Sequence, residues 1–381
     1  MALPRVVVTG VGLMSALGGS AQKNWQKLAA GEIAIALRQP FLSLPPMPLA
    51  IMGKYPRPID RIVRSVVEEA WSDAGLAVSC DRNCGVAIGS SRSHLREWEA
   101  MAVRQRQAAW EGDWLAALSH MPALLAARTI GSEGPLLAPM AACATGVWAI
   151  AQGADLIRGG QCQRVVAGAV ESPITPLTIA GFRKMGALAT AGCYPFDRDR
   201  EGFVLGEGGA VVVLEAADVA EQRGADIYGE VLATGLTNDG HHVSSFDPTY
   251  RMGKQALALC LRRSGLSARM VDAVHAHGTS TAQNDRMEAH LVEQMLGKQV
   301  PVMATKGAMG HTLGASGAAI VVLSLMSLKH QRVLPCVGLN EPDFDLNFVR
   351  QARVQRLKNI LCFSFGFGGQ NAVLALSSSR R

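Results

Sequence analysis

Three separate segments of the chain contain side chains that could act on a thioester. Cys143 lies in the sequence Ala-Ala-Cys-Ala-Thr-Gly, where small neighbours leave space around the sulfur. His277 follows an apolar run and precedes Gly-Thr-Ser-Thr, and His311 ends the sequence Lys-Gly-Ala-Met-Gly-His. A thiolate can attack a thioester carbonyl, and two neutral imidazoles can donate hydrogen bonds to one developing enolate or oxyanion. These residue types are therefore typical of a Cys-His-His site for thioester chemistry.

Each of these residues also has an ordinary structural interpretation. A Cys between alanines can be a small buried hydrophobe, and a single His beside an apolar segment is usually a satisfied core residue. Two His in turns rich in Gly and Thr, in a chain whose Cys143 opens an apolar helix, favour the catalytic interpretation. Because unpaired N–H groups carry partial positive charge, we expect the helix N-terminus to lower the pKa of this thiol.

Two charged residues, Lys306 and Glu288, lie close in sequence to the two His. They could form an ion pair that tunes the imidazoles. An ordinary surface pair, which contributes little, is an equally good interpretation.

A glycine-rich segment near the end of the chain, Ser-Phe-Gly-Phe-Gly-Gly-Gln-Asn, bends a strand sharply. Its backbone N–H groups could face an oxyanion, and Phe365 or Phe367 could guard an apolar tunnel beside Gly366, Gly368 and Gly369. A simple hairpin corner is the alternative. The apolar flanking strands favour the buried role.

Length and composition indicate a folded protein of two halves. The 381 residues exceed the size at which a single simple core stops growing, and 49% of them are hydrophobic. The 40 Gly suit layers of helix and sheet whose strands end in tight turns. A net charge of +6 without a long Lys/Arg block argues against nucleic-acid binding, but it would favour encounter with an acidic carrier.

The eight Cys are scattered, which predicts free thiols in a reducing, cytoplasmic compartment. Cys80 and Cys84 are close together, but no second pair completes a zinc site, so we expect no metal. The apolar run at the N-terminus is soon interrupted by Thr and Gly, and a first strand fits better than a signal peptide. The apolar helix expected at residues 315–328 is too short to span a bilayer of about 30 Å, and we expect it in the core.

Hydrophobic periodicity and turn residues predict alternating strands and helices. Asp60 is expected to cap one of the helices. This order predicts an α/β fold of two duplicated βαβ-rich halves, residues 1–222 with Cys143 and residues 223–381 with both His. The predicted strands are 5–10, 85–89, 136–140, 164–168, 227–235, 271–277, 300–304, 360–365 and 372–376, and the predicted helices are 21–31, 60–74, 93–109, 119–130, 143–158, 253–264, 286–296 and 314–329.

Two further patterns are weak. The Val-Thr-Gly-Val-Gly after the first strand lacks the third glycine of a dinucleotide-binding fingerprint, because Ser15 stands there. Tyr250 and Lys254 have the spacing of a short-chain reductase pair, but they lie beside a loop that contains Pro. Together they leave a nicotinamide-dependent reductase as a minor alternative.

The chain resembles the elongating (KAS I/II) type of β-ketoacyl-acyl carrier protein synthases in the thiolase-like superfamily, from Val6 to Leu376. Two His, rather than one His and one Asn, point away from the initiating KAS III type. The motifs that carry the resemblance, in chain order, are residues 142–146, 195–197 with 202–208, 276–281, Lys306 with 310–311, and 365–369.

The resemblance implies a layered α-β-α-β-α thiolase-like fold and a decarboxylative Claisen condensation. In this mechanism Cys143 takes an acyl group from acyl carrier protein, and His277 and His311 hold the malonyl thioester as an enolate develops. The N–H groups of Cys143 and Phe365 would form an oxyanion hole, and Phe365 would gate the site. Lys306, Glu288 and Asp285 would support it, and Thr279 and Thr281 would bind the phosphopantetheine arm.

The resemblance also implies a homodimer and a carrier-protein partner, without organic cofactor, metal or membrane span. His275 replaces the Asn that is usual in the family, and the basic residues that help dock the carrier are sparse. Candidate replacements are Arg61, Arg64, Arg198 and Arg200. The alternative is a non-catalytic partner subunit like a chain-length factor, but such subunits lack the nucleophilic Cys that this chain retains.

Overall fold

The computed structural model describes residues 3–79, 81–106 and 114–379. Its main sheet has ten strands, and two small two-stranded sheets lie outside it. The main strands are β1 (Val6–Ser15), β4 (Cys84–Gly89), β5 (Leu136–Leu137), β6 (Arg164–Glu171), β7 (Gly208–Ala216), β8 (Gly229–Asn238), β9 (Ala273–His275), β10 (Val302–Met303), β13 (Asn359–Gly366) and β14 (Gln370–Ser377). The two-stranded sheets pair β2 (Ala36–Arg38) with β3 (Met47–Leu49) and β11 (Arg332–Val333) with β12 (Arg353–Val354).

The main sheet consists of two parts with the same topology. Its order is β10-β9-β13-β14-β8-β1-β7-β6-β4-β5, and β1 meets β8 at only Val7↔Glu230 and Val8↔Gly229. Outward from this seam, each part has two antiparallel pairings followed by two parallel ones. The predicted duplicated α/β fold is confirmed.

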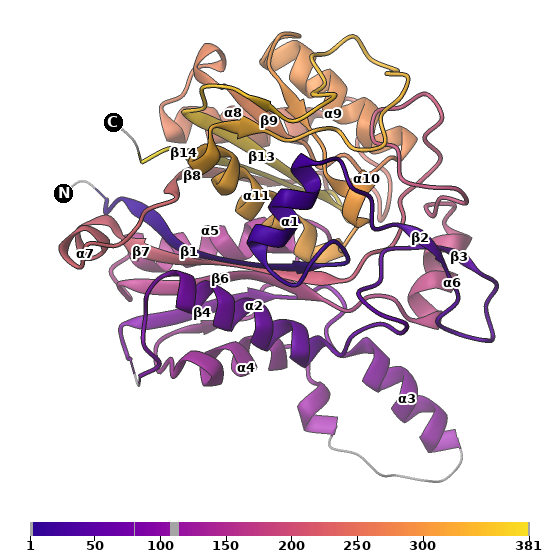
Figure 1. Cartoon of the computed structure of the whole chain (residues 1–381), viewed down its shortest axis with the longest axis horizontal. Coiled ribbons are helices and arrows are strands. Elements are labelled where there is room, and N and C mark those ends of the chain that lie inside the picture. Colours follow the sequence, from indigo (N-terminus) through magenta and orange to yellow (C-terminus); the bar gives the residue numbers. More distant parts are fainter. Residues whose placement is uncertain (1–2, 80, 107–113, 380–381) are drawn as a thin grey trace.

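Helices cover and separate the two parts of the sheet, which gives five layers (Figure 1). In the view of Figure 1, α8 and α9 lie above the second part, α5 and α11 lie between the parts, and α2 and α4 cover the outer face of the first. The helices are α1 (Ala21–Ala29), α2 (Ile59–Asp73), α3 (Leu95–Arg106), α4 (Met121–Ile130), α5 (Thr145–Arg158), α6 (Pro176–Lys184), α7 (Ala217–Gln222), α8 (Arg251–Ser264), α9 (Ala282–Met295), α10 (Lys306–Met309) and α11 (Ser316–His330).

The two central helices approach each other closely at a glycine. A Cβ on Gly146 in α5 would overlap the backbone nitrogen of Ala318 in α11. Cys143 precedes α5 and His311 precedes α11, so this crossing brings both segments to the same place. Close packing at a glycine thus positions residues from the two halves of the chain.

Helix α11 is buried on all sides, from Ser316 to Leu328, as expected for the central layer. With the preceding 3-10 turn it forms an 18-residue segment, Leu313–His330, that is long and apolar enough to cross a membrane. The prediction that it is too short was therefore wrong. However, 89% of this segment is buried inside the molecule, as in the core helix of a soluble protein.

Several local predictions differ from the structure. Strand β7 was missed, and β9 ends at His275, so His277 lies in the loop beyond it. Asp60 does not cap α2: Pro58 occupies the N-cap, and the Asp60 carboxylate instead lies 3.0 Å from His94 Nε2. The helix predicted for residues 93–109 begins at Leu95, and residues 107–109 lie outside the described part of the chain.

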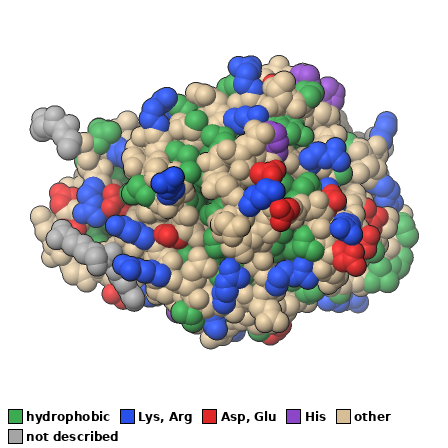
Figure 2. Space-filling model, turned by 90° about the horizontal axis from the view of Figure 1, so that it is seen from above, with side chains coloured by type: hydrophobic (Ala, Val, Ile, Leu, Met, Phe, Trp, Pro, Cys, Tyr) green, Lys and Arg blue, Asp and Glu red, His purple; other side chains and the backbone are tan. Residues whose placement is uncertain are grey.

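The surface charge is dispersed on the face seen from above in Figure 2. Lys and Arg side chains form separate spots there, with acidic side chains among them. The described cysteines are buried and unpaired, while Cys80 lies outside the described residues.

Candidate active site

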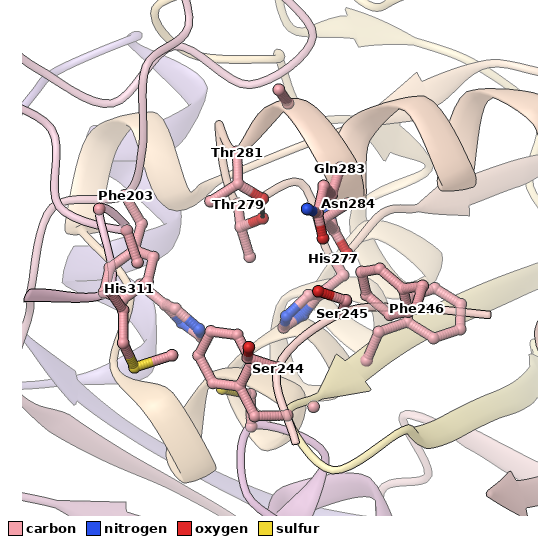
Figure 3. A pocket seen from close by; sticks show the side chains of 18 of the residues that line it. Phe203, Ser244, Ser245, Phe246, His277, Thr279, Thr281, Gln283, Asn284 and His311 are labelled. Atoms are coloured by element: carbon pink, nitrogen blue, oxygen red, sulfur yellow. Dashed lines mark hydrogen bonds between the residues drawn. The ribbon is translucent and has the colours of Figure 1, made fainter. Parts of the chain in front are cut away.

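The structure brings together the three residues that the sequence singled out. Cys143 Sγ and one ring nitrogen each of His277 and His311 all lie within 4.8 Å of one another. The two imidazole rings are 5.3 Å apart between centroids and nearly perpendicular, and both face the same cavity (Figure 3). All three residues are buried. They therefore form one compact cluster beneath a pocket.

The pocket has a volume of about 340 Å³, and the thiol lines its floor together with both imidazoles. Thr279 and Thr281 lie on its wall, with their hydroxyl oxygens 2.9 Å apart (Figure 3). The other lining residues are Met185, Gly186, Ala187, Glu201, Phe203, Ser244, Ser245, Phe246, Ala282, Gln283, Asn284, Phe365, Gly366 and Phe367.

Lys306 sets the hydrogen-bonding state of His277. Its ammonium group donates to the His277 carbonyl oxygen and lies 3.2 Å from His277 Nδ1. Because a protonated Lys can only donate, Nδ1 accepts, and the ring proton sits on Nε2. Burial lowers the pKa of both His277 and His311 well below the usual range, and Lys306 adds to this effect. The pocket therefore contains two neutral imidazoles.

Glu288 holds the backbone of the His277 turn. Its carboxylate accepts the N–H groups of His277 and Gly278, both at 2.6 Å, and the Asn284 amide at 2.7 Å. Burial raises the pKa of Glu288 to about 7, and it lowers the pKa of Lys306 to about 8. Both side chains are buried, so the surface-pair interpretation is wrong. Within the described residues they form no direct ion pair, and they contact different groups of His277: Glu288 its backbone N–H, and Lys306 its carbonyl oxygen and Nδ1.

Asp285 supports the neighbouring loops. It accepts the backbone N–H of Phe196 at 2.7 Å and that of Ser280 at 3.2 Å. Asn284, which the sequence did not single out as a site residue, donates to both Asp285 and Glu288.

The prediction of a lowered thiol pKa was wrong. Burial raises the pKa of Cys143 to about 11, and the opposing effects of Lys306 and Arg92 do not compensate. The α-helix begins at Thr145 rather than at Cys143, so the thiol precedes the helix by one turn residue. Ala142 has φ +46°, a left-handed conformation that is unfavourable for Ala and is common at functional turns.

The backbone group next to the thiol comes from Phe367, not from Phe365. The Phe367 N–H donates to the Cys143 sulfur and favours its thiolate. A Cβ on Gly366 would lie 3.0 Å from the Cys143 nitrogen, so a glycine is needed for this approach. Gly368 and Gly369 have φ +77° and +75°, which makes the turn.

The two phenylalanines lie differently. Phe365 is buried within β13, with the rings of Phe246, His277 and Phe363 at 6.5, 6.3 and 5.9 Å. Phe367 is half-buried in the turn, with its ring 6.0 Å from that of Phe182.

Sequence reasoning missed part of the pocket wall. Phe203 packs edge-on against His311 at 5.1 Å, although it lies in a glycine-rich motif that could have indicated it. Ser244, Ser245 and Phe246 come from a loop whose sequence carries no signal of a site.

Two of the four candidate docking residues are already engaged. The Arg200 side chain is 4% exposed, and it lies 2.8 Å from Asp343. Arg198 is 3.6 Å from Glu341. Arg61 and Arg64 are exposed on α2.

The two weak patterns have structural explanations. Gly10 and Gly12 lie within β1, where a Cβ would overlap the Ala70 and Val66 carbonyl oxygens of α2. They therefore permit close packing of helix on strand. Tyr250 is the residue before α8, and its ring packs against His290 at 5.5 Å.

Comparisons with known proteins agree with this geometry. The family model for the beta-ketoacyl synthase N-terminal domain matches residues 52–220, and that for the C-terminal domain matches residues 228–340. Relatives named 3-oxoacyl-[acyl-carrier-protein] synthase 2 include one from Coxiella burnetii, 32% identical and covering 98% of both chains. Another, from Synechocystis, is 33% identical and covers 97% of both chains.

Solved structures show the same fold. A chain from the complex of a type II polyketide synthase acyl carrier protein with its ketosynthase bound to the hexaketide has a TM-score of 0.94 and 26% identity, covering 99% of this chain and 100% of that one. A beta-ketoacyl synthase from Burkholderia phymatum has a TM-score of 0.90 and 28% identity, with the same coverage. With family models that match most of its length and relatives that align end to end, the chain belongs to the beta-ketoacyl synthase family.

Proposed function

We propose that Cys143, His277 and His311 carry out the decarboxylative Claisen condensation by which this beta-ketoacyl synthase extends an acyl chain with malonyl-acyl carrier protein. The product would be a 3-oxoacyl thioester of a fatty acid or polyketide. The observation that supports these roles is the convergence of one thiol and two neutral imidazoles within 4.8 Å at the floor of one pocket.

In the first step, the Cys143 sulfur attacks the acyl thioester carbonyl and the carrier sulfur leaves. The thiol proton passes to the departing carrier sulfur, so the exchange is balanced. The N–H groups of Cys143 and Phe367 would bind the oxyanion, in place of the Phe365 donor expected from the sequence. This change follows from the contact between Phe367 N–H and the thiol.

In the second step, a malonyl thioester loses carbon dioxide. Its carbonyl oxygen accepts hydrogen bonds from His277 and His311 while the electrons of the broken C–C bond form an enolate. The enolate carbon then attacks the Cys143 acyl carbonyl, a new C–C bond forms, and the Cys143 sulfur leaves as a thiolate that takes up a proton from solvent. Lys306 favours this step because it holds His277 as the Nε2–H tautomer.

The pocket wall is suited to the arm of a carrier. Thr279 and Thr281 would bind the phosphopantetheine amides, since their hydroxyls face the cavity (Figure 3). We assign the gate to Phe367 rather than Phe365, because Phe367 lies in the glycine turn of Gly366, Gly368 and Gly369.

No organic cofactor or metal takes part in this scheme, because loss of carbon dioxide drives it. The Cys143-His277-His311 cluster also has the spacing of a metal-binding group. However, Lys306 places a cation beside His277, which disfavours a second cation there.

The test uses purified protein with acyl and malonyl carrier proteins. We expect a 3-oxoacyl product, no acylation of Cys143→Ala, and acylation without condensation in His277→Ala and His311→Ala. Intact-mass measurement follows the acyl-enzyme, and condensation that persists in Cys143→Ala would contradict the mechanism. A protein that is inert alone but active beside a second ketosynthase would support the chain-length-factor alternative.

The carrier would dock on a group of cations beside the pocket mouth, which we call the basic lip: Arg38, Lys54, Arg183 and Lys184. Arg183 and Lys184 directly precede the pocket residue Met185, and Arg183 lies 3.9 Å from Met47 Sδ. Met47 is the strand partner of Arg38, which lines a surface hollow with Lys54. All four cations are exposed, and the ion pairs found among the described residues use other cations.

A homodimer would cover the arm formed by α3 and the turn Trp114–Ala117. Figure 1 shows α3 projecting from the layered body, and its exposed apolar side chains include Trp98 and Val103. We expect the native protein to sediment as a dimer and the Trp98→Asp/Val103→Asp variant to sediment as a monomer. A native protein that is monomeric at all concentrations would contradict this proposal.

We also propose a cytoplasmic location and a division of the chain into residues 1–222 and 223–381. The division falls between α7 and β8, so that each half holds five strands of the main sheet.

A further inference from the structure

His275 connects two elements that position the site, although it does not line the pocket. It is the last residue of β9 and is completely buried. Its Nδ1 lies 3.0 Å from Ser324 Oγ in α11, and its Nε2 lies 3.1 Å from Thr305 Oγ1. The imidazole therefore bridges the central helix and the loop that precedes α10.

The hydroxyl of Thr305 is bonded outside its own helix. Thr305 is the N-cap of α10, and a Thr there ordinarily accepts an N–H of its own helix. No such cap bond forms, and the Thr305 hydroxyl is instead bonded to His275. The next residue is Lys306, which holds His277 through its carbonyl oxygen and Nδ1.

We propose that His275 is a positioning residue for the decarboxylation step, acting through Thr305 and Lys306 on the His277 imidazole. The bridge fixes the start of α10 against α11, and thereby the ammonium group that determines the His277 tautomer. This inference rests on the proposed function and adds a residue to it.

The chemistry of His275 suits this role. Burial, together with a smaller effect of Lys306, lowers its pKa to about 3, so the ring is neutral at physiological pH. It therefore adds hydrogen bonds without placing a second positive charge beside Lys306. A neutral ring with nitrogens on two sides can reach Ser324 and Thr305 together, whereas a shorter amide cannot.

Two matched pairs of variants test the bridge. Thr305→Val removes the hydroxyl and Thr305→Ser keeps it. His275→Asn retains the reach of Nδ1 toward Ser324, whereas His275→Gln retains the reach of Nε2 toward Thr305. We expect Thr305→Val and His275→Asn to slow condensation about tenfold, with Cys143 acylation changed by less than about twofold. Thr305→Ser and His275→Gln should stay close to the native rates.

Imidazole ¹⁵N spectra add a readout that does not depend on turnover. The spectrum of Lys306→Met assigns the His277 Nδ1 signal and shows its position without the ammonium group. The signal should shift toward that position in Thr305→Val and His275→Asn, but not in Thr305→Ser and His275→Gln. The proposal would be overturned if Thr305→Val and His275→Asn slowed acylation and condensation equally, or left the His277 signal unchanged. It would also be overturned if the two variants of each pair had the same rates and spectra. If the native protein does not condense, the proposed function fails, and the ¹⁵N spectra alone decide the positioning role.

Discussion

At the scale of single residues, the site combines a thiol that burial keeps protonated with one buried cation. The pKa of Cys143 is raised to about 11 by burial, while Lys306 opposes this shift. Removal of the Lys306 charge should therefore raise the pKa of Cys143 further. At any pH below that pKa, a smaller fraction of Cys143 would then be thiolate. Reactivity toward an alkylating agent should fall accordingly.

We predict that Lys306→Met slows alkylation of Cys143 by iodoacetamide at pH 7 by roughly tenfold, because Lys306, with a pKa of about 8, is mostly charged there. In the native protein the rate should rise with pH toward about 11, because only the thiolate reacts. Peptide mapping separates Cys143 from the other thiols. Lys298→Met, which removes a cation bound to surface Asp345, is the control and should leave the rate unchanged. An equal rate in both variants would contradict the electrostatic role of Lys306.

At the scale of elements, the crossing of α5 and α11 positions the reactive groups. We predict that Gly146→Ala costs about 1–3 kcal/mol in the free energy of unfolding, because the new methyl group overlaps the Ala318 backbone. Gly181→Ala is the matched control: Gly181 is exposed in α6 with no atom near its Cβ position. This second change should stabilise the protein by up to about 1 kcal/mol. Urea unfolding measures both, and similar effects of the two substitutions would contradict the packing argument.

The same scale explains which elements could be predicted from the sequence. Strands and helices that alternate with Gly-rich turns, such as α8 and β13, follow from local periodicity. Strand β7 was overlooked although its Val211–Leu214 run is typical of a buried strand. Strand β9 was predicted, as residues 271–277, but its end at His275 could not be, because that end is set by pairing with β10 and β13 rather than by composition.

The sequence allowed the reactive residues of the site to be predicted, but not the placement of the backbone around them or the pKa of the thiol. Cys143, His277 and His311 stand in recognisable motifs, so their residue types could be found. Phe365 and Phe367 are two residues apart, and only the end of strand pairing at Gly366 places one in the sheet and the other in the turn. The thiol pKa depends on desolvation, which is a property of packing between the two halves and is invisible to local sequence.

At the scale of the whole molecule, we expect the positive charge of the basic lip to attract an acidic carrier protein. We predict that Arg183→Glu/Lys184→Glu in the basic lip raises the KM for an acyl carrier protein about tenfold or more, because an acidic partner meets reversed charge. Acyl transfer from a small pantetheine thioester should not change, since the pocket is intact. A loss of both activities would point to a damaged pocket instead.

The control for this prediction is Arg128→Glu, an exposed cation at the end of α4, away from the pocket lining. It reverses one positive charge where the lip variant reverses two, and it should leave the KM for the carrier nearly unchanged. Added salt should raise the KM for the carrier protein more in the native protein than in the lip variant. Equal salt dependence in the two proteins would contradict docking at the lip.

The division of the reactive groups along the chain has a consequence for biosynthesis. Cys143 emerges from the ribosome long before His277 and His311, and the Phe367 amide that meets the sulfur belongs to the turn before β14, the last strand of the main sheet. A nascent chain that has folded only its first half therefore contains Cys143 without the imidazoles of His277 and His311 beside it. In the proposed mechanism, acylation of Cys143 must wait until translation has delivered the β13–β14 hairpin, so that covalent labelling of Cys143 by an acyl donor would report assembly of both parts of the main sheet.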